Sequence, residues 1–457
     1  MASMVTLAAF CIVLCVFVVL QWPIMLALAI GLGLFLLHGL LTGHKLPVMV
    51  RSGWKTCRSV LPIIVTFMLI GMLTASWRAS GTVPFLVSYA SRAIAAPQVV
   101  VPLVFVCNAL MSMLTGSAFA TAATMGVITV TLAVSVGASP MLVGGAMLSG
   151  AYFGDRCSPM STSALLVATL TGTKVFDNLR NMARSCAIPT VISLVAFGIW
   201  GWCDARRGVA ADGSSVHALD VAGLFGGVFD LRWWTVLPAL LVVALACCRL
   251  DVRMLMAAGC LASLPLCLAV QHMGWMEMLS TLVFGYRCPD ARVGALIDGG
   301  GILSMLNVTG IVLLSSSYSG IFAETGLLIG VRSLVQAMGR RIGVFGATLA
   351  TSLAAAAVAC NQTLGIMLTR QLCRGLTDDN SAEALNLEDS AVVVSSLVPW
   401  AIACSVPLST VGAPTLSVCA ACFLYVLPLW HWLSSTVRGE RASGAVRRPV
   451  AGHNERR

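Results

Sequence analysis

The stretch GAYFGDRCSPMSTS (150–163) places an aspartate and an arginine side by side, directly after a nearly uncharged apolar run. A proline, Pro159, and several hydroxyl side chains follow immediately. Proline removes a backbone donor from a helix and frees carbonyl groups there. The pattern predicts an apolar helix that breaks next to Asp155, with polar groups gathered at the break. The hydroxyl residues are Ser158, Ser161, Thr162 and Ser163.

The composition is that of a membrane protein. Of the 457 residues, 58% are hydrophobic and 10% are charged, whereas a soluble domain has about 25% charged residues. Runs such as 5–20 and 23–41 approach the length of about 20 residues that crosses a bilayer as a helix. They lack the alternation of outer-membrane strands. We therefore expect an all-α polytopic membrane protein with about 10–13 transmembrane helices.

Charge and cysteine content exclude several other classes. The net charge of +10 comes mainly from arginines in short loops, as the positive-inside rule predicts, so we expect no nucleic-acid partner. Most of the 17 cysteines lie inside apolar runs, where they behave as small hydrophobic residues. The six histidines show no metal-ligand spacing. We expect neither an enzyme nor a bound cofactor, and a homodimer is left open.

The loop charges suggest an orientation. The basic loop at 45–58 follows a hairpin of two apolar runs, which places it and the N-terminus in the cytoplasm. Three further apolar runs follow a second basic segment, at 185–203, 233–248 and 254–271. This odd number puts 272–297 outside. We expect a multi-pass protein of the cell membrane with both termini cytoplasmic.

The two halves of the chain show the same order of interruptions. Each has an apolar run broken by small polar residues, then a second polar-rich break, then an acidic residue with Ser and Pro. Interrupted helices at corresponding positions of two inverted halves are typical of transporters. The sequence therefore predicts two inverted repeats with discontinuous helices. The segments are 69–86, 115–126 and 150–163 in the first half, and 313–328, 360–372 and 387–400 in the second.

This plan divides the chain into five parts. They are an N-terminal helical hairpin with a cytoplasmic loop (1–58), a first transport repeat (59–184), connecting helices and loops (185–297), a second, inverted repeat (298–432) and a basic cytoplasmic tail (433–457).

Acidic residues point to the chemistry because only 18 are present. Most lie in loops, but Asp155, Glu324, Glu388 and Asp389 lie beside or within broken apolar segments. A charge near the bilayer centre costs at least about 2.5–3.5 kcal/mol. A carboxylate can bind either a small cation or a proton. Competition between the two for one set of carboxylates is the simplest basis for cation/proton exchange.

A dehydrated cation also needs neutral oxygen ligands, which unwound helices and nearby polar side chains supply. We place Na⁺ at Asp155 and expect the binding set Asp155, Ser158, Ser161, Thr162, Ser163, Asn361, Gln362, Glu388 and Asp389. Other residues would line the helix breaks, namely Ser117, Thr121, Glu324, Pro159 and Pro399.

Simpler interpretations stay open for the charged residues. Asp155 and Arg156 could form a salt bridge or a helix cap near the headgroups. Glu388 and Asp389 could cap the apolar run at 391–404. Arg78 could extend toward the membrane interface.

Four segments carry a family resemblance: SWRASGTVP (76–84), GAYFGDRCSP (150–159), SGIFAETG (319–326) and LEDSAVVVSSLVPW (387–400). In this order they resemble the NhaC-type sodium/proton antiporters of the ion-transporter superfamily. The resemblance implies exchange of Na⁺ for H⁺ and an inverted-repeat fold. It also implies core positions at Asp155, Ser158, Glu388 and Asp389, with Trp77 and Thr82 lining the first break.

The sequence departs from that family at two places. Thr162 stands where the family commonly has a second acid, and SAFAT (117–121) replaces a break that often contains an aromatic residue. Similar proteins exchange small organic acids. The alternative is therefore a Na⁺- or H⁺-coupled exchanger of small organic anions or amino acids, as in malate/lactate antiport. Such an exchanger would be marked by a cationic side chain in the site, and Arg78, Arg156 or Arg370 could supply it.

Overall fold

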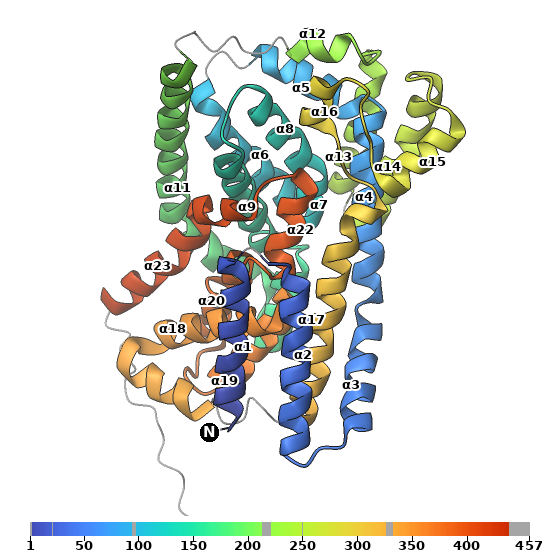
Figure 1. Cartoon of the computed structure of the whole chain (residues 1–457). Coiled ribbons are helices and arrows are strands. Elements are labelled where there is room, and N and C mark those ends of the chain that lie inside the picture. The colour runs from blue at the N-terminus through green and yellow to red at the C-terminus, as the bar shows by residue number, and fades with distance from the viewer. Residues whose placement is uncertain are drawn as a thin grey trace, which may run out of the picture.

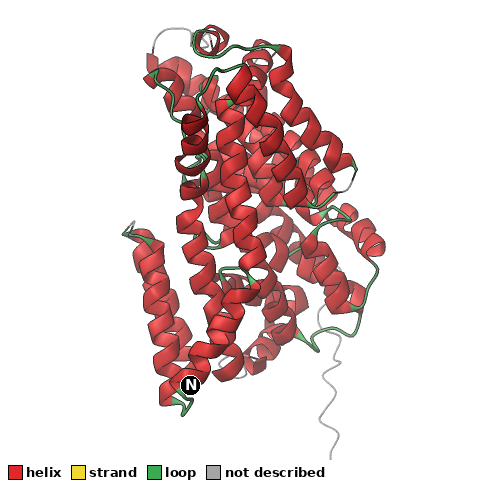
Figure 2. Cartoon of the chain, turned by 90° about the vertical axis from the view of Figure 1, so that its right-hand side faces the viewer, coloured by secondary structure: helices red, strands yellow, loops and turns green. Residues whose placement is uncertain are grey.

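A computed structural model describes residues 2–20, 22–93, 97–212, 221–248, 250–325 and 332–437. Within these residues the chain folds into helices without a strand, as Figures 1 and 2 show. The all-α class expected from the sequence is confirmed. Most of the expected basic tail, at 438–457, lies outside the described residues.

The helices of the first half are α1 (Ala2–Val19), α2 (Ile24–Leu41), α3 (Leu46–Ser59), α4 (Leu61–Ala79), α5 (Thr82–Ala93), α6 (Val100–Thr115), α7 (Ala118–Thr121), a π-helical turn (Ala122–Gly126), α8 (Val127–Ser135), α9 (Pro140–Arg156) and α10 (Thr162–Thr171). The connecting region contains α11 (Val175–Asp212), α12 (Val221–Gly226), a 3₁₀ turn at Trp233–Val236, α13 (Leu237–Cys247), α14 (Val252–Ala269), α15 (Trp275–Phe284) and α16 (Ala291–Ile297). The second half contains α17 (Leu306–Thr325), α18 (Arg332–Ala359), α19 (Gln362–Cys373), α20 (Asn380–Glu388), α21 (Ala391–Val394), α22 (Ile402–Val411) and α23 (Cys422–Val437).

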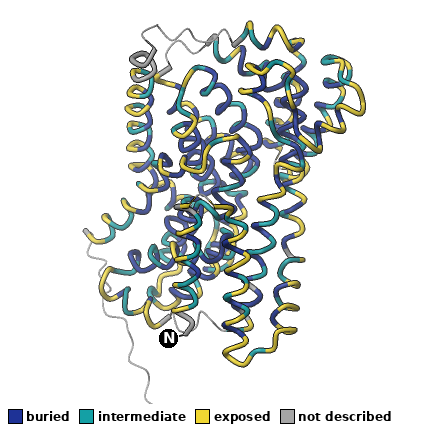
Figure 3. The backbone as a smooth tube through the Cα atoms, in the orientation of Figure 1, coloured by how far each residue is buried: buried dark blue, intermediate teal, exposed yellow. Residues whose placement is uncertain are grey.

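Seven helices in the described residues are long and apolar enough to cross a membrane, and a pair bent by 54° makes an eighth. The bent pair is Asn380–Leu397 with Ile402–Val411. Continuous spans are fewer than the expected number because several apolar runs fold as shorter helices, such as α6 and α10. Many apolar side chains on the outer helices are exposed, and Figure 3 marks exposed residues along α1, α2 and α11. Lipid would cover such side chains in a membrane.

Helix α9 lies unusually close to α6 because two glycines face that helix. A Cβ atom at Gly150 would lie 3.0 Å from the backbone nitrogen of Ala109, and one at Gly154 would lie 2.6 Å from that of Met113. Small residues permit such close approach between membrane helices. The close contact fixes where α9 ends, and therefore where Asp155 lies.

Two of the helix breaks have the same backbone geometry. Gly116 ends α6 with φ 64°, and the extended Ser117 then caps α7. Cys360 follows α18 with φ 54°, and the extended Asn361 then caps α19. The polar residues expected to break both halves therefore do so in the same way, through one left-handed residue and one side-chain cap.

The next two breaks also match. Pro159 lies two residues before the N-cap of α10, and Pro399 lies two residues before the N-cap of α22. Both helices have ten residues and end at a left-handed glycine, Gly172 and Gly412. The correspondence supports a shared plan for the two halves, whereas their inverted orientation stays a prediction.

Candidate ion-binding site

Asp155 lies in the last turn of α9 and is 5% exposed. The chain reverses after Pro159, so the start of α10 covers the carboxylate. Ser161 Oγ donates to Asp155 Oδ1 at 3.0 Å, and Ser163 Oγ donates to Oδ2 at 3.2 Å. The two hydroxyls are also 2.7 Å apart. The sequence segment that predicted a broken helix thus forms a compact cluster of side-chain oxygens around one acid.

The second half of the chain reaches the same carboxylate. The Gln362 side chain, at the start of α19, interacts with Asp155, and its Nε2 donates to the Val392 carbonyl at 2.9 Å. The breaks of the second half also touch each other, because the Ile402 N–H donates to the Cys360 carbonyl at 2.9 Å. Breaks from both halves of the sequence therefore meet at Asp155.

Asp389 is fully buried, and its charge is compensated. Arg156 forms a salt bridge with Oδ1. Ser185 on α11 donates to the same oxygen at 3.3 Å, and His431 Nδ1 on α23 lies 2.5 Å from Oδ2. Arg156 also donates to Ser185 at 2.9 Å. Asp389 thus joins α20 to α9, α11 and α23.

Glu388 lies next to Asp389 but has the opposite surroundings. It is fully buried, and no hydrogen-bond donor in the described residues reaches either carboxylate oxygen. The charges of Arg156, Asp389 and Asp155 all act on it. A buried ionised carboxylate without partners is costly, so it requires a proton or a cation.

The cluster therefore contains three buried carboxylates and one guanidinium, that of Arg156, and its net charge is negative when the acids are ionised and His431 is neutral. No group of three or more His, Cys, Asp or Glu side chains in the described residues is arranged as a metal centre. A cation bound here would need neutral oxygens, which Ser161, Ser163 and Gln362 can offer. The burial of the acids means that the conformation is closed to solvent.

The other expected residues near the breaks hold the backbone instead. Ser158 Oγ donates to the Met113 carbonyl at 2.9 Å, and Thr121 Oγ1 donates to the Ser117 carbonyl at 2.9 Å. Thr162 begins α10 and is exposed, whereas its neighbours Ser161 and Ser163 are buried. Three further residues form the breaks themselves: Asn361 as a cap, and Pro159 and Pro399 as half-buried turn residues.

Three expected residues are not brought to the carboxylates. Trp77 is buried in α4, where its indole faces Gly259 of α14. Thr82 donates to the Thr235 carbonyl at 2.8 Å. Glu324 is exposed in the last turn of α17. The structure therefore gives them no shared role with Asp155.

The structure also decides between the interpretations left open for the charged residues. Arg156 pairs with Asp389 rather than with its neighbour Asp155. Glu388 and Asp389 stand at the C-terminal end of α20, and Ser390 is the N-cap of α21, so neither acid caps the following helix.

The arginines considered for an anion site have partners of their own. Arg78 is 5% exposed and donates to the Asp298 carbonyl at 2.8 Å, so it does not extend to the interface. Arg370 lies 3.6 Å from Glu383.

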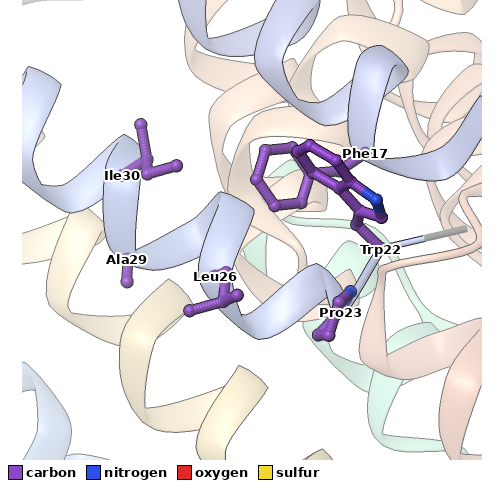
Figure 4. A pocket seen from close by; sticks show the side chains of 6 residues that line it. All are labelled: Phe17, Trp22, Pro23, Leu26, Ala29 and Ile30. Carbon is purple, nitrogen blue, oxygen red and sulfur yellow. The ribbon is translucent and has the colours of Figure 1, made fainter. Parts of the chain in front are cut away.

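A surface cavity of about 680 Å³ lies elsewhere, at the turn between α1 and α2 (Figure 4). Its lining offers no carboxylate or hydroxyl group, so it cannot coordinate a small cation. The residues are Phe17, Trp22, Pro23, Leu26, Ala29 and Ile30.

Sequence reasoning missed His431 and Ser185. Ser185 follows the basic segment at the start of α11, His431 lies within the apolar part of α23, and no motif spacing connects either residue to Asp389. The only signal was that an apolar run at 422–437 contains a histidine.

Comparison with known proteins identifies the family of this chain. The family model of the "Na+/H+ antiporter family" matches residues 1–202 and 204–432. The chain belongs to the Na⁺/H⁺ antiporter family. The resemblance to NhaC-type proteins is thus confirmed.

Three relatives indicate the range of this family. The Na(+)/H(+) antiporter NhaC of Bacillus subtilis is 27% identical over 81% of this chain and 82% of its own length. The Malate-2H(+)/Na(+)-lactate antiporter of the same organism is 25% identical over 84% and 82%. The Arginine/ornithine antiporter ArcD of Halobacterium salinarum is 27% identical over 80% and 76%. All three are named as antiporters.

Proposed function

We propose that this antiporter exchanges Na⁺ for H⁺ and that the two ions share the carboxylates of Asp155 and Glu388. One observation carries the proposal: two buried acids without a cationic partner of their own lie close enough for their charges to interact. Their negative charges repel each other in a medium of low dielectric constant. One positive ion between them, or protons on them, relieves that repulsion.

Asp155 is the residue best prepared to hold Na⁺. Its carboxylate would supply the negative charge, while the Ser161 and Ser163 hydroxyl oxygens can turn from donating to the carboxylate to accepting the cation. The Gln362 amide oxygen and carbonyls freed at the breaks would complete the shell. Protonation of the carboxylate removes its charge, and the cation then leaves.

Glu388 would take the proton. Its oxygens have no donors that would favour the ionised form over the protonated form, whereas Asp155 has two hydroxyl donors. Asp389 is a weaker candidate because Arg156 and His431 already occupy its two oxygens. Of the adjacent acids, we therefore assign the transport role to Glu388.

Exchange requires that this closed cluster open alternately to the two sides. The paired breaks at Gly116 and Cys360, and at Pro159 and Pro399, are where the helices would change direction. We place the protein in the cell membrane with both termini cytoplasmic, because of the basic loop at 45–58. The mechanism uses no cofactor and no catalytic step and is complete within one chain. A homodimer stays a prediction.

The test is uptake of radioactive sodium into proteoliposomes under an imposed pH gradient. We expect gradient-driven uptake by the wild type and its loss in Asp155→Asn. Glu277→Gln is the matched control, because it changes an exposed acid on α15 in the same way. The proposal is abandoned if folded wild-type protein moves no sodium, or if Asp155→Asn transports as well as the control.

A second candidate is exchange of small organic anions or amino acids, because two relatives carry such names. Its observed support is one buried guanidinium, Arg156, within the cluster. That guanidinium is occupied by Asp389 and Ser185, which favours the sodium assignment. Loading the same proteoliposomes with malate, lactate, arginine or ornithine separates the two: counterflow of any of them, driven by a sodium or a proton gradient, would support the second candidate.

A further inference from the structure

One face of α3 carries a row of exposed basic residues that the transport mechanism does not use. Arg51, Lys55 and Arg58 are exposed, and Trp54 between them is 63% exposed. The spacing of three and four residues places all four on one side of the helix. We call these four residues the basic stripe. From it we propose that α3 binds the headgroup of an anionic phospholipid.

The opposite face of α3 is packed against a candidate membrane-spanning helix. Ser52 Oγ donates to the Gly320 carbonyl at 3.2 Å, and Cys57 Sγ donates to the Leu313 carbonyl at 3.2 Å. The outer face therefore points away from the protein. Figure 1 shows α3 standing beside α17 and leading directly into α4.

The start of the stripe lies near the membrane surface, because Ser52 contacts Gly320, two residues before the candidate span of α17 ends at Phe322. The contact of Cys57 with Leu313 places Arg58 deeper, where a long side chain extends back toward the headgroups.

The stripe ends three residues before α4, whose Leu61–Ala79 is apolar enough to span the bilayer. The seven-residue separation of Arg51 and Arg58 covers about 10 Å along the helix, comparable with a headgroup layer of roughly 5–7 Å plus the reach of the side chains. Trp54 is the residue type that prefers this interface.

The charges of the stripe are available to a ligand. No salt bridge joins Arg51, Lys55 or Arg58 to an acid in the described residues. The Arg58 guanidinium lies 6.0 Å from the Trp54 ring centroid, which leaves its donors free for a phosphate. Clusters of basic residues next to a transmembrane helix attract anionic lipids.

The positive-inside rule alone accounts for basic residues on α3, but it does not require that they lie on one face of the helix. A lipid site does require this alignment, because the phosphate lies along one helix face, with the indole of Trp54 at the boundary with the acyl chains. A variant that keeps every charge but rotates one of them off this face distinguishes the two explanations. Val50→Arg combined with Arg51→Val does so, because Val50 is 53% exposed and lies about 100° around the helix from Arg51, away from Lys55 and Arg58.

The experiment is lipid binding by the purified full chain in detergent, measured by native mass spectrometry and by thermal unfolding. Dioleoylphosphatidylglycerol and cardiolipin are compared with dioleoylphosphatidylcholine. We expect both anionic lipids to bind and raise Tm, and phosphatidylcholine to do neither. Loss of three basic residues should weaken binding roughly a hundredfold, at about fivefold for each. The variant is R51Q/K55Q/R58Q.

Two controls decide the interpretation. R184Q/R253Q/R292Q removes the same charge from exposed positions elsewhere and should keep wild-type lipid binding. The V50R/R51V exchange should lose binding about as much as removing one basic residue, roughly fivefold.

The proposal is overturned if both triple variants bind phosphatidylglycerol equally. It is also overturned if the exchange variant retains full affinity, or if phosphatidylcholine binds as well as the anionic lipids.

Discussion

Glu388 and Asp389 are adjacent in sequence, yet their amide substitutions should affect stability in opposite ways. Asp389→Asn removes the negative charge that compensates Arg156, which is itself fully buried. Breaking a buried ion pair by removing one partner costs about 3–5 kcal/mol. Glu388→Gln replaces a carboxyl group that no donor reaches with a neutral amide of the same shape, so we expect a change of no more than about 1 kcal/mol in either direction.

The difference is large enough to measure as a shift in Tm. With about 2.1 cal/mol/K of unfolding entropy per residue, a chain of 457 residues should lose roughly 3–5 °C in Asp389→Asn and about 1 °C or less in Glu388→Gln. Thermal unfolding of detergent-purified protein, followed by tryptophan fluorescence, gives both values. The charge-balanced double variant R156Q/D389N should recover at least half of the loss, because no buried charge is then left without its partner.

The reasoning is refuted if Glu388→Gln lowers Tm as much as Asp389→Asn does. It is equally refuted if R156Q/D389N is no more stable than Asp389→Asn alone, since Arg156 would then not be the partner that matters.

The remaining predictions concern ligands, anchoring and packing. Ser161→Ala should raise the KM for Na⁺ about fivefold to tenfold, because it removes a hydroxyl oxygen that contacts Asp155. Ser158→Ala should leave the KM unchanged, because the Ser158 hydroxyl donates to the Met113 carbonyl. Sodium uptake at varied sodium concentration measures both values, and equal effects would show that Ser161 is not a sodium ligand. His431→Ala should lower Tm by roughly 1–3 °C, since it leaves one oxygen of Asp389 without a donor. His431→Asn should restore part of this loss in the same unfolding assay. A wild-type Tm in His431→Ala would mean that the contact does not contribute to stability. Gly154→Ala should destabilise the folded protein by about 1–3 kcal/mol, because its methyl group would lie 2.6 Å from the Met113 backbone nitrogen. Gly198→Ala is the control, because a methyl group there meets open space. Thermal unfolding compares the two variants, and an equal Tm would contradict the packing argument.

The sequence predicted the helix breaks well because their signals are local. Pro159, Pro399 and the polar residues at 115–126 and 360–372 act on the backbone within a few positions of themselves. Their consequences, a left-handed residue, a cap and a short helix, follow from adjacent residues. The same is true of Asp155, whose hydroxyl partners lie within eight positions in the chain.

The partners of the other acids could not be predicted because they come from distant segments. Asp389 meets Arg156 across 233 positions and His431 across 42, and no spacing rule connects them. Trp77 and Thr82 entered through a family motif rather than through a physical argument, and they contact α14 and the Trp233–Val236 turn instead of the carboxylates. One sequence showed which residues are unusual, but not which of them meet.

The central claim is that Na⁺ and H⁺ compete for the same carboxylates, and the pH dependence of sodium transport tests it most directly. Initial rates of sodium uptake into proteoliposomes would be measured over a range of sodium concentrations at several pH values, with equal pH on both sides. Competition predicts that the apparent KM for Na⁺ falls as pH rises while the maximal rate changes little. A KM that stays constant while only the maximal rate changes would contradict a shared site and would place the proton elsewhere in the chain.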